Sequence, residues 1–332
     1  MISQKLNLSQ KIFKKEVEMI PTRQGYGEGL VIAGERDEKV VVLTADLKES
    51  TKSNIFAEKF PERFIECGVA EQGMATIAAG MATYGKIPFI GSYAVFSPGR
   101  NWEQIRTTIA LNDVPVKIAG HHTGVSVGPD GATHQMLEDI ALMRAMPNMI
   151  VVVPSDSVEA KKATMEAAKN GKPTYLRFTR EKTPVMTSEK TPFKIGKAEP
   201  FWESKDPKVA IIACGHLVYE ALLAARELEK SKIEILVINS HTIKPLDEQA
   251  IIKAAKITGA VVTVEEHQKA GGLGGAVAEV LARNFPVPIE FIGMPDLFGE
   301  SGQPDELLEK YGMKAKNIID ACKKVISRKQ EQ

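Results

Sequence analysis

The chain has 332 residues, of which 43% are apolar, and its 43 Lys and Arg residues nearly balance its 42 Asp and Glu residues. A net charge of +1 and only 6% aromatic residues argue against nucleic acid or an anionic membrane as a partner. At about 100–200 residues per domain, this length predicts two domains. Three widely spaced cysteines, and the lack of a signal-like or membrane-spanning apolar run, lead us to expect a soluble, cytoplasmic protein.

The first half of the chain alternates between short apolar runs and longer helical patterns. The expected strands are Lys39–Thr44, Ile87–Ser92, Pro115–Gly120, Met149–Pro154 and Pro173–Phe178, and the expected helices are Arg23–Glu35, Ala70–Tyr84, Gly99–Asn112 and Ser157–Asn170. Strands that are apolar on both faces are typical of a parallel sheet covered by helices on both sides. This pattern predicts an α/β domain over residues 1–183.

The alternation lapses and then resumes in the second half. Residues 184–207 contain four prolines among Thr, Ser, Lys and Glu, which predicts an extended linker. Beyond it we expect strands at Val209–Cys214, Ile233–Asn239, Ala260–Glu265 and Pro288–Ile292, and helices near Leu217–Glu229, Asp247–Lys256, Gly274–Arg283 and Asp305–Tyr311, followed by a polar helix end or tail over Lys323–Gln332. The predicted fold class is therefore α/β, with two domains of mainly parallel sheets and a second, smaller domain over 208–332.

Two clusters near residue 270 invite a binding role. The glycines of GGLGG (residues 271–275) follow a strand and precede a helix, where amides could hold an anion, but Val277 breaks the G-x-G-x-x-G pattern, so a tight turn is favoured. Glu265 and Glu266 beside His267 suggest a metal site, yet adjacent residues lack the spacing of metal ligands. We expect these three residues to be solvated or to lie at a subunit contact.

Residues 128–135, GPDGATHQ, form a loop of small residues that contains Asp130 and His134. Upstream, His121 and His122 end a predicted strand at the carboxyl edge of the sheet, where parallel sheets bind ligands. Imidazoles and a carboxylate could therefore converge here, although ordinary loop hydrogen bonding is an equally open alternative. The segment has no G-x-S-x-G sequence, so a hydrolase triad is not indicated.

Glu71 lies in the first turn of a predicted helix that is rich in Ala and Gly. An acidic residue at this position stabilises a helix through its dipole, which is the simplest interpretation of Glu71. The small side chains of the helix indicate, in addition, that another group approaches its backbone closely.

The sequence resembles the thiamine-diphosphate enzymes of the transketolase group, in their pyrimidine-binding and C-terminal domains, over nearly the whole chain. The resemblance rests on GVAEQGM at residues 68–74, GPDGATHQ at 128–135 and PSDSVEA at 154–160. It implies that Glu71 hydrogen-bonds the aminopyrimidine of the cofactor and that Phe96, with Tyr93 as a second candidate, stacks on that ring. For these aromatic residues, a place in the core is the alternative.

The same resemblance implies a substrate site. It implies that the sugar phosphate is bound by Arg23, Ser50, His122 and Arg180. It also implies that Asp130 and His134 contact the hydroxyls and the oxyanion of the ketose. An imidazole, that of His134 or His122, would move the hydroxyl proton during carbon–carbon cleavage. A surface or capping role is the alternative for Arg23, Ser50 and Arg180.

Full-length relatives of this group also carry an N-terminal domain with a Gly-Asp-Gly motif that holds Mg2+ and, through it, the diphosphate. This chain has no Gly-Asp-Gly sequence. The resemblance therefore implies the C-terminal subunit of a split transketolase, with no metal ligand of its own, which shares thiamine diphosphate with a separate N-terminal subunit in a dimer of heterodimers. Such an enzyme moves a two-carbon ketol unit from a ketose phosphate to an aldose phosphate.

Three alternatives remain open at this point. The chain could act like a 1-deoxy-D-xylulose-5-phosphate synthase or like the beta subunit of a 2-oxo acid dehydrogenase. It could also be a non-catalytic regulatory or structural subunit.

Overall fold

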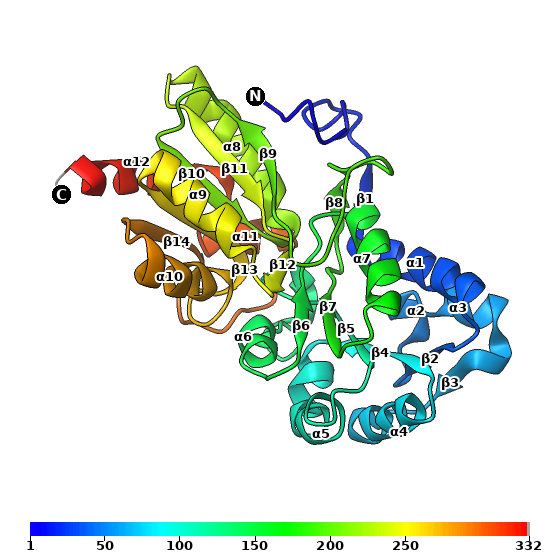
Figure 1. Cartoon of the computed structure of the whole chain (residues 1–332). Helices are drawn as coiled ribbons and strands as arrows, with labels where there is room; N and C mark the ends of the chain where they lie inside the picture. Colours follow the sequence, from blue (N-terminus) through cyan, green and yellow to red (C-terminus); the bar gives the residue numbers. More distant parts are fainter. Residues whose placement is uncertain (331–332) are drawn as a thin grey trace.

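The computed structural model describes residues 1–330 and contains two α/β units, each built on its own sheet (Figure 1). The first sheet has seven strands in the order β12-β6-β7-β5-β4-β2-β3, and only β12 pairs antiparallel. Its strands are β2 (Val40–Thr44), β3 (Phe64–Glu66), β4 (Ile87–Tyr93), β5 (Lys117–His121), β6 (Ile150–Val152), β7 (Thr174–Arg177) and β12 (Thr242–Lys244). The predicted α/β class with a mainly parallel sheet is confirmed.

Helices cover both faces of this sheet because successive strand residues face opposite layers. In β2, Val40 and Val42 pack into one apolar cluster, while Val41 and Leu43 pack into another. The layer of Val40 is formed by α1 (Thr22–Arg36), α2 (Lys48–Thr51), α3 (Asn54–Lys59) and α7 (Ser157–Lys169); the opposite layer is formed by α4 (Glu71–Thr83), α5 (Trp102–Gln104) and α6 (Asp139–Arg144). The expected helix Gly99–Asn112 is interrupted, since helical segments Val95–Arg100 and Ile105–Ala110 flank α5.

The second sheet has five strands in the order β14-β13-β10-β11-β9, with β9 antiparallel to β11. Its strands are β9 (Glu199–Glu203), β10 (Val209–Ala213), β11 (Ile235–Asn239), β13 (Val261–Gln268) and β14 (Ile289–Met294). Its helices are α8 (Val218–Lys230), α9 (Glu248–Thr258), α10 (Leu273–Asn284), α11 (Pro304–Lys310) and α12 (Ala315–Gln330).

One expectation differs from this part of the structure. The predicted linker 184–207 is partly ordered as β9, because Phe201 and Trp202 are buried in the second core and fix an edge strand there. The expected polar helix end or tail from Lys323 is the end of α12, and Cys322 and Val325 of this helix contribute to the same core. The remaining two residues of that expectation, 331–332, lie outside the described residues.

The two units also exchange segments. Strand β12, from the second half of the chain, adds to the edge of the first sheet beside β6. Conversely, Leu6 and Ile12 from the N-terminal segment pack into the second core, and the Ser3 amide donates to the carbonyl of Phe201 at 3.0 Å. Strands β1 (Met19–Pro21) and β8 (Lys182–Pro184) form a small antiparallel pair between them. Within residues 1–330, no helix combines the length and apolar character needed to cross a bilayer.

Candidate active site

Glu71 begins α4 with its carboxylate almost completely buried, at 2% exposure. Arg100 Nη1 donates to Glu71 Oε2 at 2.9 Å, and Asn101 Nδ2 donates to the Glu71 carbonyl at 3.0 Å. The location at the start of α4 agrees with an interaction with the helix dipole. Burial of a carboxylate costs free energy, however, and a dipole interaction at the surface does not require it. Glu71 is therefore placed for more than helix stability.

Aromatic rings lie beside this carboxylate. Tyr93 ends β4, and its ring is stacked on those of Phe96 and His122, with centroids 6.1 Å and 3.9 Å apart. Arg100 connects this group to Glu71, because its guanidinium lies 4.9 Å from the Phe96 ring centroid. Both Tyr93 and Phe96 are only partly buried, unlike the aromatic residues of the core.

Two arginines lie near His122. Arg23 Nη1 donates to the carbonyl of Ser50, and Arg180 Nη1 donates to the carbonyl of Val127, each at 2.8 Å. Burial, and then the proximity of Arg180, lowers the pKa of Arg23. Ser50 thus takes part through its backbone, where it orients a guanidinium.

His122 is held in a left-handed conformation with φ of +53°, which turns its ring away from the path of β5 and toward Tyr93. Burial, and then the charges of Arg23 and Arg180, lower the pKa of His122 to about 3. The imidazole is therefore neutral in the free chain. A neutral ring close to two guanidiniums is suited to an anion, because binding the anion relieves the repulsion between the arginines.

The imidazoles and the carboxylate proposed to converge do so only in part. His134 is edge-on to Phe96, with centroids 5.6 Å apart, and its Nδ1 lies 2.9 Å from Thr133 Oγ1. His121 points the opposite way, into the core beside Tyr26, so it is not part of this site. Asp130 lies exposed on the same loop as His134, and no hydrogen bond in the described part of the chain joins it to the other site residues.

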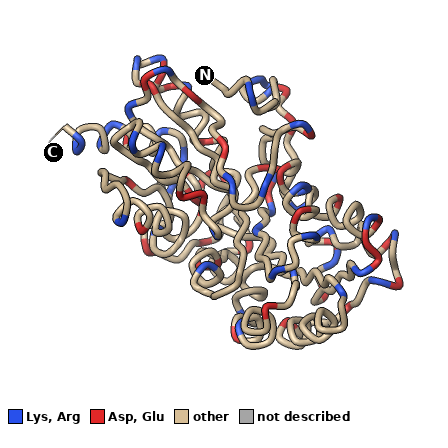
Figure 2. Tube along the Cα trace, viewed as in Figure 1, with Lys and Arg blue, Asp and Glu red and all other residues tan. Residues whose placement is uncertain are grey.

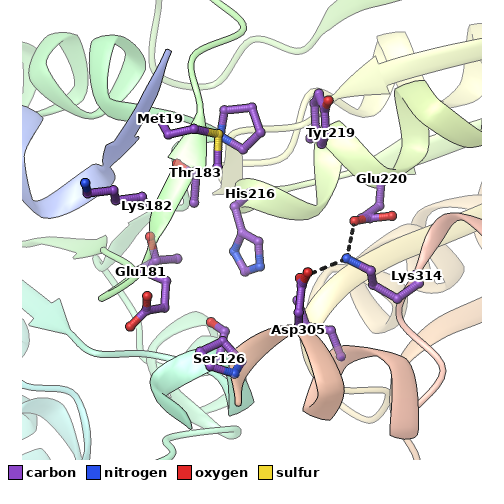
Figure 3. A pocket seen from close by; sticks show the side chains of 14 residues that line it. Met19, Ser126, Glu181, Lys182, Thr183, His216, Tyr219, Glu220, Asp305 and Lys314 are labelled. Atoms are coloured by element: carbon purple, nitrogen blue, oxygen red, sulfur yellow. Dashed lines mark hydrogen bonds and ion pairs between the residues drawn. The ribbon is translucent and has the colours of Figure 1, made fainter. Parts of the chain in front are cut away.

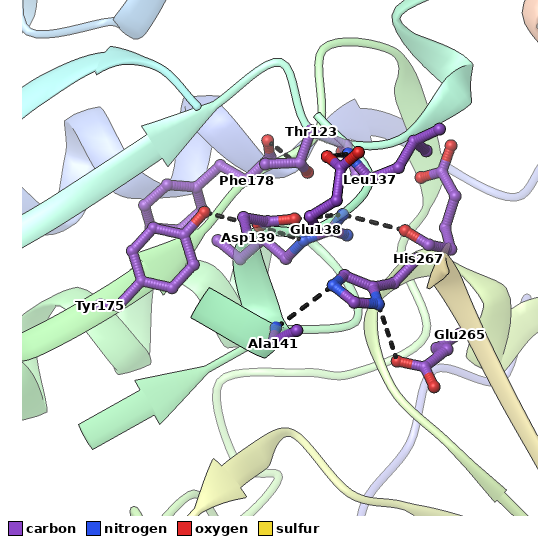
Figure 4. Close-up of polar contacts among 12 residues, drawn as sticks. Thr123, Leu137, Glu138, Asp139, Ala141, Tyr175, Phe178, Glu265 and His267 are labelled. Carbon is purple, nitrogen blue, oxygen red and sulfur yellow. Dashed lines mark hydrogen bonds and ion pairs between the residues drawn. The ribbon is translucent and has the colours of Figure 1, made fainter. Parts of the chain in front are cut away.

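The expectation that Glu265, Glu266 and His267 are solvated is wrong, because all three are buried. Figure 4 shows Glu265 beside His267, and the latter near Ala141 of the first unit. Glu265 accepts from the amides of Leu273 and Gly274 at 2.7 and 2.8 Å. The GGLGG segment therefore forms a tight turn whose anion is a carboxylate of the chain itself. No group of three or more His, Cys, Asp and Glu side chains within residues 1–330 is arranged to hold a metal ion.

Sequence reasoning missed Arg100 as a partner of Glu71. The motif PSDSVEA, by contrast, has a structural part to play: Asp156 accepts from the Glu159 amide at 2.8 Å and caps α7. The polar residues of a motif therefore do not all belong to the site, and the structure is needed to separate them.

The site lies at the carboxyl ends of β4, β5 and β7, where open parallel sheets bind ligands. Residues 18–186 match the transketolase pyrimidine binding domain, and residues 196–318 match the transketolase C-terminal domain. The chain belongs to the transketolase family.

Relatives of this transketolase chain are of two lengths. It is 46% identical to a putative transketolase C-terminal section of Methanocaldococcus jannaschii, over 91% of this chain and 96% of that protein. It is 39% identical to a 6-deoxy-6-sulfo-D-fructose transketolase subunit of a Clostridium species, over 96% of this chain and 98% of that protein. Human transketolase is 36% identical over 94% of this chain, which spans only 50% of the human protein.

Solved structures give the same picture. A split gene transketolase, described as an inactive beta4 tetramer, superposes with a TM-score of 0.87 at 43% identity and covers 93% of this chain and 99% of that chain. Campylobacter jejuni transketolase superposes with a TM-score of 0.78 at 25% identity, over 94% of this chain and 49% of that chain.

Transketolases depend on thiamine diphosphate, which supplies carbanion chemistry at a ketose carbon when it is bound. The site residues fit the pyrimidine part of this group. The planar guanidinium of Arg100 already makes a hydrogen bond to Glu71 and a stacking contact with Phe96, the two contacts that a flat, polar heterocycle requires. Glu71 and Phe96 would therefore hold the pyrimidine.

Proposed function

We propose that this chain is the C-terminal subunit of a split transketolase, which transfers a two-carbon ketol unit from a ketose phosphate to an aldose phosphate. The observation that carries the proposal is a continuous set of contacts that connects the buried carboxylate of Glu71 with the cluster of Arg23, His122 and Arg180. Tyr93 joins the two parts, since its ring contacts both Phe96 and His122.

Each residue has a defined task in this proposal. Arg23 and Arg180 bind the phosphate of the sugar by charge-assisted hydrogen bonds, and His122 lies close enough to both that their charges lower its pKa. Asp130 binds a hydroxyl of the ketose, and His134 accepts and returns the hydroxyl proton during carbon–carbon cleavage. Glu71 holds a proton at the ring nitrogen of the pyrimidine.

The second subunit in the proposal is an N-terminal transketolase chain that carries a Gly-Asp-Gly motif and holds Mg2+ and the diphosphate. The support is that single-chain transketolases are about twice as long as the matched region. The cofactor then lies at the interface between the subunits, with Glu71 and Phe96 contributed by this chain.

Helix α4 offers a surface for such an assembly. Beyond Glu71 it carries no charged residue, and its exposed face consists of Gln, Gly, Thr and Ile side chains that include Ile77 at 48% exposure (Figure 2). Nothing lies within 4 Å of a Cβ placed on Gly80, so a second backbone can approach closely. We propose that this face joins two copies of the heterodimer, and we place the assembly in the cytoplasm because Cys67, Cys214 and Cys322 are all unpaired.

Reconstitution tests the proposal. This chain, the Gly-Asp-Gly subunit, thiamine diphosphate and Mg2+ are mixed with xylulose 5-phosphate and ribose 5-phosphate, and ketol transfer is measured. We expect turnover only when both chains are present. Full activity of this chain alone would contradict the split, and turnover only with pyruvate and glyceraldehyde 3-phosphate would replace transketolase with a 1-deoxy-D-xylulose-5-phosphate synthase-like activity.

A sulfonated ketose is a second candidate donor. The support is the relative that is a 6-deoxy-6-sulfo-D-fructose transketolase subunit, which matches nearly the whole chain at 39% identity. A sulfonate presents three oxygens to Arg23 and Arg180 as a phosphate does, but with a smaller charge. The ratio of kcat/KM for the sulfonated and phosphorylated ketoses in the reconstituted complex decides between them.

A further inference from the structure

The loop over residues 124–135, here called the substrate loop, rests on the second unit of the chain. Gln135 Nε2 donates to the carbonyl of Glu300 at 2.9 Å, and the same nitrogen donates to the carbonyls of Val125 and Gly128 within the loop. Gly131 packs so closely on Ser301 that a Cβ there would lie 2.6 Å from the Ser301 hydroxyl. The loop that carries Asp130 and His134 is thus shaped by contacts with another domain.

Glu266 makes a charged contact between the second unit and the substrate loop. Its Oε1 accepts from the Ser126 amide at 2.6 Å, although the two residues are 140 positions apart in the sequence. Gly124 adopts φ of +81°, and a Cβ at that position would lie 2.1 Å from the Glu266 carboxyl carbon. The backbone of the substrate loop is therefore folded around this carboxylate, whose side chain is 2% exposed.

The backbone of Glu266 is held by the first unit in return. Arg177 Nη2 donates to the Glu266 carbonyl at 2.9 Å, and the same guanidinium makes a bidentate pair with Asp139 at 2.7 and 3.2 Å. Tyr175 adds a hydrogen bond to Asp139 at 2.6 Å, as Figure 4 shows. Removal of either partner of such a buried pair is costly, so this network fixes the end of β13 against the first sheet.

The other carboxylate oxygen of Glu266 faces His216, whose Nδ1 lies 3.5 Å away. His216 and Ser126 line a cavity of about 220 Å³ between the two units (Figure 3). Within residues 1–330, Glu266 Oε2 accepts no hydrogen bond, and the Glu266 carboxylate is held by the Ser126 amide at Oε1.

We propose that Glu266 is a positioning residue that holds the substrate loop in the conformation that presents Asp130 and His134 to the ketose. Ser126 is the second residue of the helical segment Val125–Asp130, so a carboxylate on its amide fixes the first turn of the segment that ends at Asp130. The task assigned to Asp130 and His134 rests on the proposed function, whereas the contact between Glu266 and the loop does not.

The test compares three substitutions of Glu266 with one matched control. Glu266→Gln keeps the length and an acceptor oxygen, Glu266→Asp keeps the charge but is one methylene too short, and Glu266→Ala removes both. The control is Glu265→Ala, because Glu265 is equally buried and accepts two amides, Leu273 and Gly274, that lie outside the loop.

Amide hydrogen exchange in the isolated chain is the first measurement. We expect exchange of the Ser126 amide to accelerate at least about tenfold in Glu266→Ala and Glu266→Asp, to stay near the wild-type rate in Glu266→Gln, and to be unchanged in Glu265→Ala. If Glu266→Ala does not fold, the Asp and Gln variants decide the result by themselves. Unchanged exchange in the Asp variant would overturn the proposal.

The second measurement is the KM for the ketose in the reconstituted complex. We expect about a tenfold increase for Glu266→Asp with a smaller change in kcat, and near-normal values for Glu266→Gln. An equal increase in KM for Glu265→Ala would show a general loss of stability and would overturn the positioning role. If the wild-type complex transfers no ketol unit at all, the proposed function fails, while the exchange experiment still decides the role of Glu266.

Discussion

Arg180→Ala should weaken binding of the sugar phosphate while leaving the rest of the site intact. Arg180 is anchored by a hydrogen bond to the Val127 carbonyl and an ion pair with the partly exposed Glu181 at 3.2 Å. Its side chain is 30% exposed, and a second guanidinium, that of Arg23, lies close by. A charge-assisted hydrogen bond contributes about 1.5–3 kcal/mol, which corresponds to roughly 10–150-fold in affinity. Because water replaces part of this interaction at a partly exposed residue, we expect about a 10–30-fold increase in KM.

The assay compares a ketose phosphate with the same ketose lacking the phosphate, in the reconstituted complex. Arg180→Ala should raise the KM of the phosphorylated donor only, since the other donor has no anion to lose. Arg283→Ala serves as the control, because Arg283 is an exposed arginine on α10. An equal increase in KM for both donors would refute the reasoning, because it would mean that the lost contact with Val127 distorts the substrate loop.

The isolated chain offers a check that needs no substrate. The pKa of His122 is lowered to about 3 by burial first, and then by the charges of Arg23 and Arg180. Removal of Arg180 should therefore raise the pKa of His122 measured by NMR titration. An unchanged pKa of His122 would mean that the two side chains do not share a site in solution.

Three further substitutions test other parts of the structure. Glu71→Ala should reduce turnover of the complex by at least about 100-fold. Thermal stability should change little, because the partner of Glu71, Arg100, is half-exposed and can be hydrated. A near-normal rate would indicate a structural subunit. Ile77→Asp should weaken self-association measured by sedimentation, with Lys86→Asp outside α4 as the control, and an unchanged oligomer would exclude the α4 face. Lys117→Met should stabilise the chain in urea, because burial without an acidic partner lowers the pKa of Lys117 to about 7. Between about pH 7 and 10.5, the unfolded state of the wild type binds one more proton than its folded state, so the wild-type free energy of unfolding rises with pH. The stability advantage of the variant should therefore be several kcal/mol below about pH 7 and disappear near pH 10.5. A difference that does not change with pH would contradict the burial effect.

The main strands could be predicted from the sequence because burial on both faces leaves a local pattern. In the run KVVVLT at residues 39–44, residues 40–43 are all apolar, so both faces of the strand are apolar. β2 covers nearly the same residues. β12 leaves no such pattern, since its three residues are ordered by pairing with β6 across the two units. β9 was also missed, because an edge strand that contains Pro200 resembles a linker until its partner strand is known.

The site shows the same division. Glu71 could be placed at a helix start, and Arg23, His122 and Arg180 could be grouped through their resemblance to transketolases, but the distances among them depend on the parallel order of β4, β5 and β7. The contact of Glu266 with the substrate loop could not be predicted. The neighbouring Glu265 is chemically identical, and only the path of the substrate loop assigns one carboxylate to a helix start and the other to Ser126.

The distribution of charge explains why a second chain belongs in the proposed enzyme. In the proposed function, Arg23 and Arg180 bind the sugar phosphate, and within residues 1–330 Arg100 is the cation paired with Glu71. The glycine-rich start of α10, which suits an anion, already binds Glu265. A diphosphate brings at least two negative charges that must be balanced by cations and amide donors. In the proposed enzyme, the donors of this chain therefore bind the pyrimidine and the sugar, and we propose that the N-terminal subunit supplies the donors for the diphosphate.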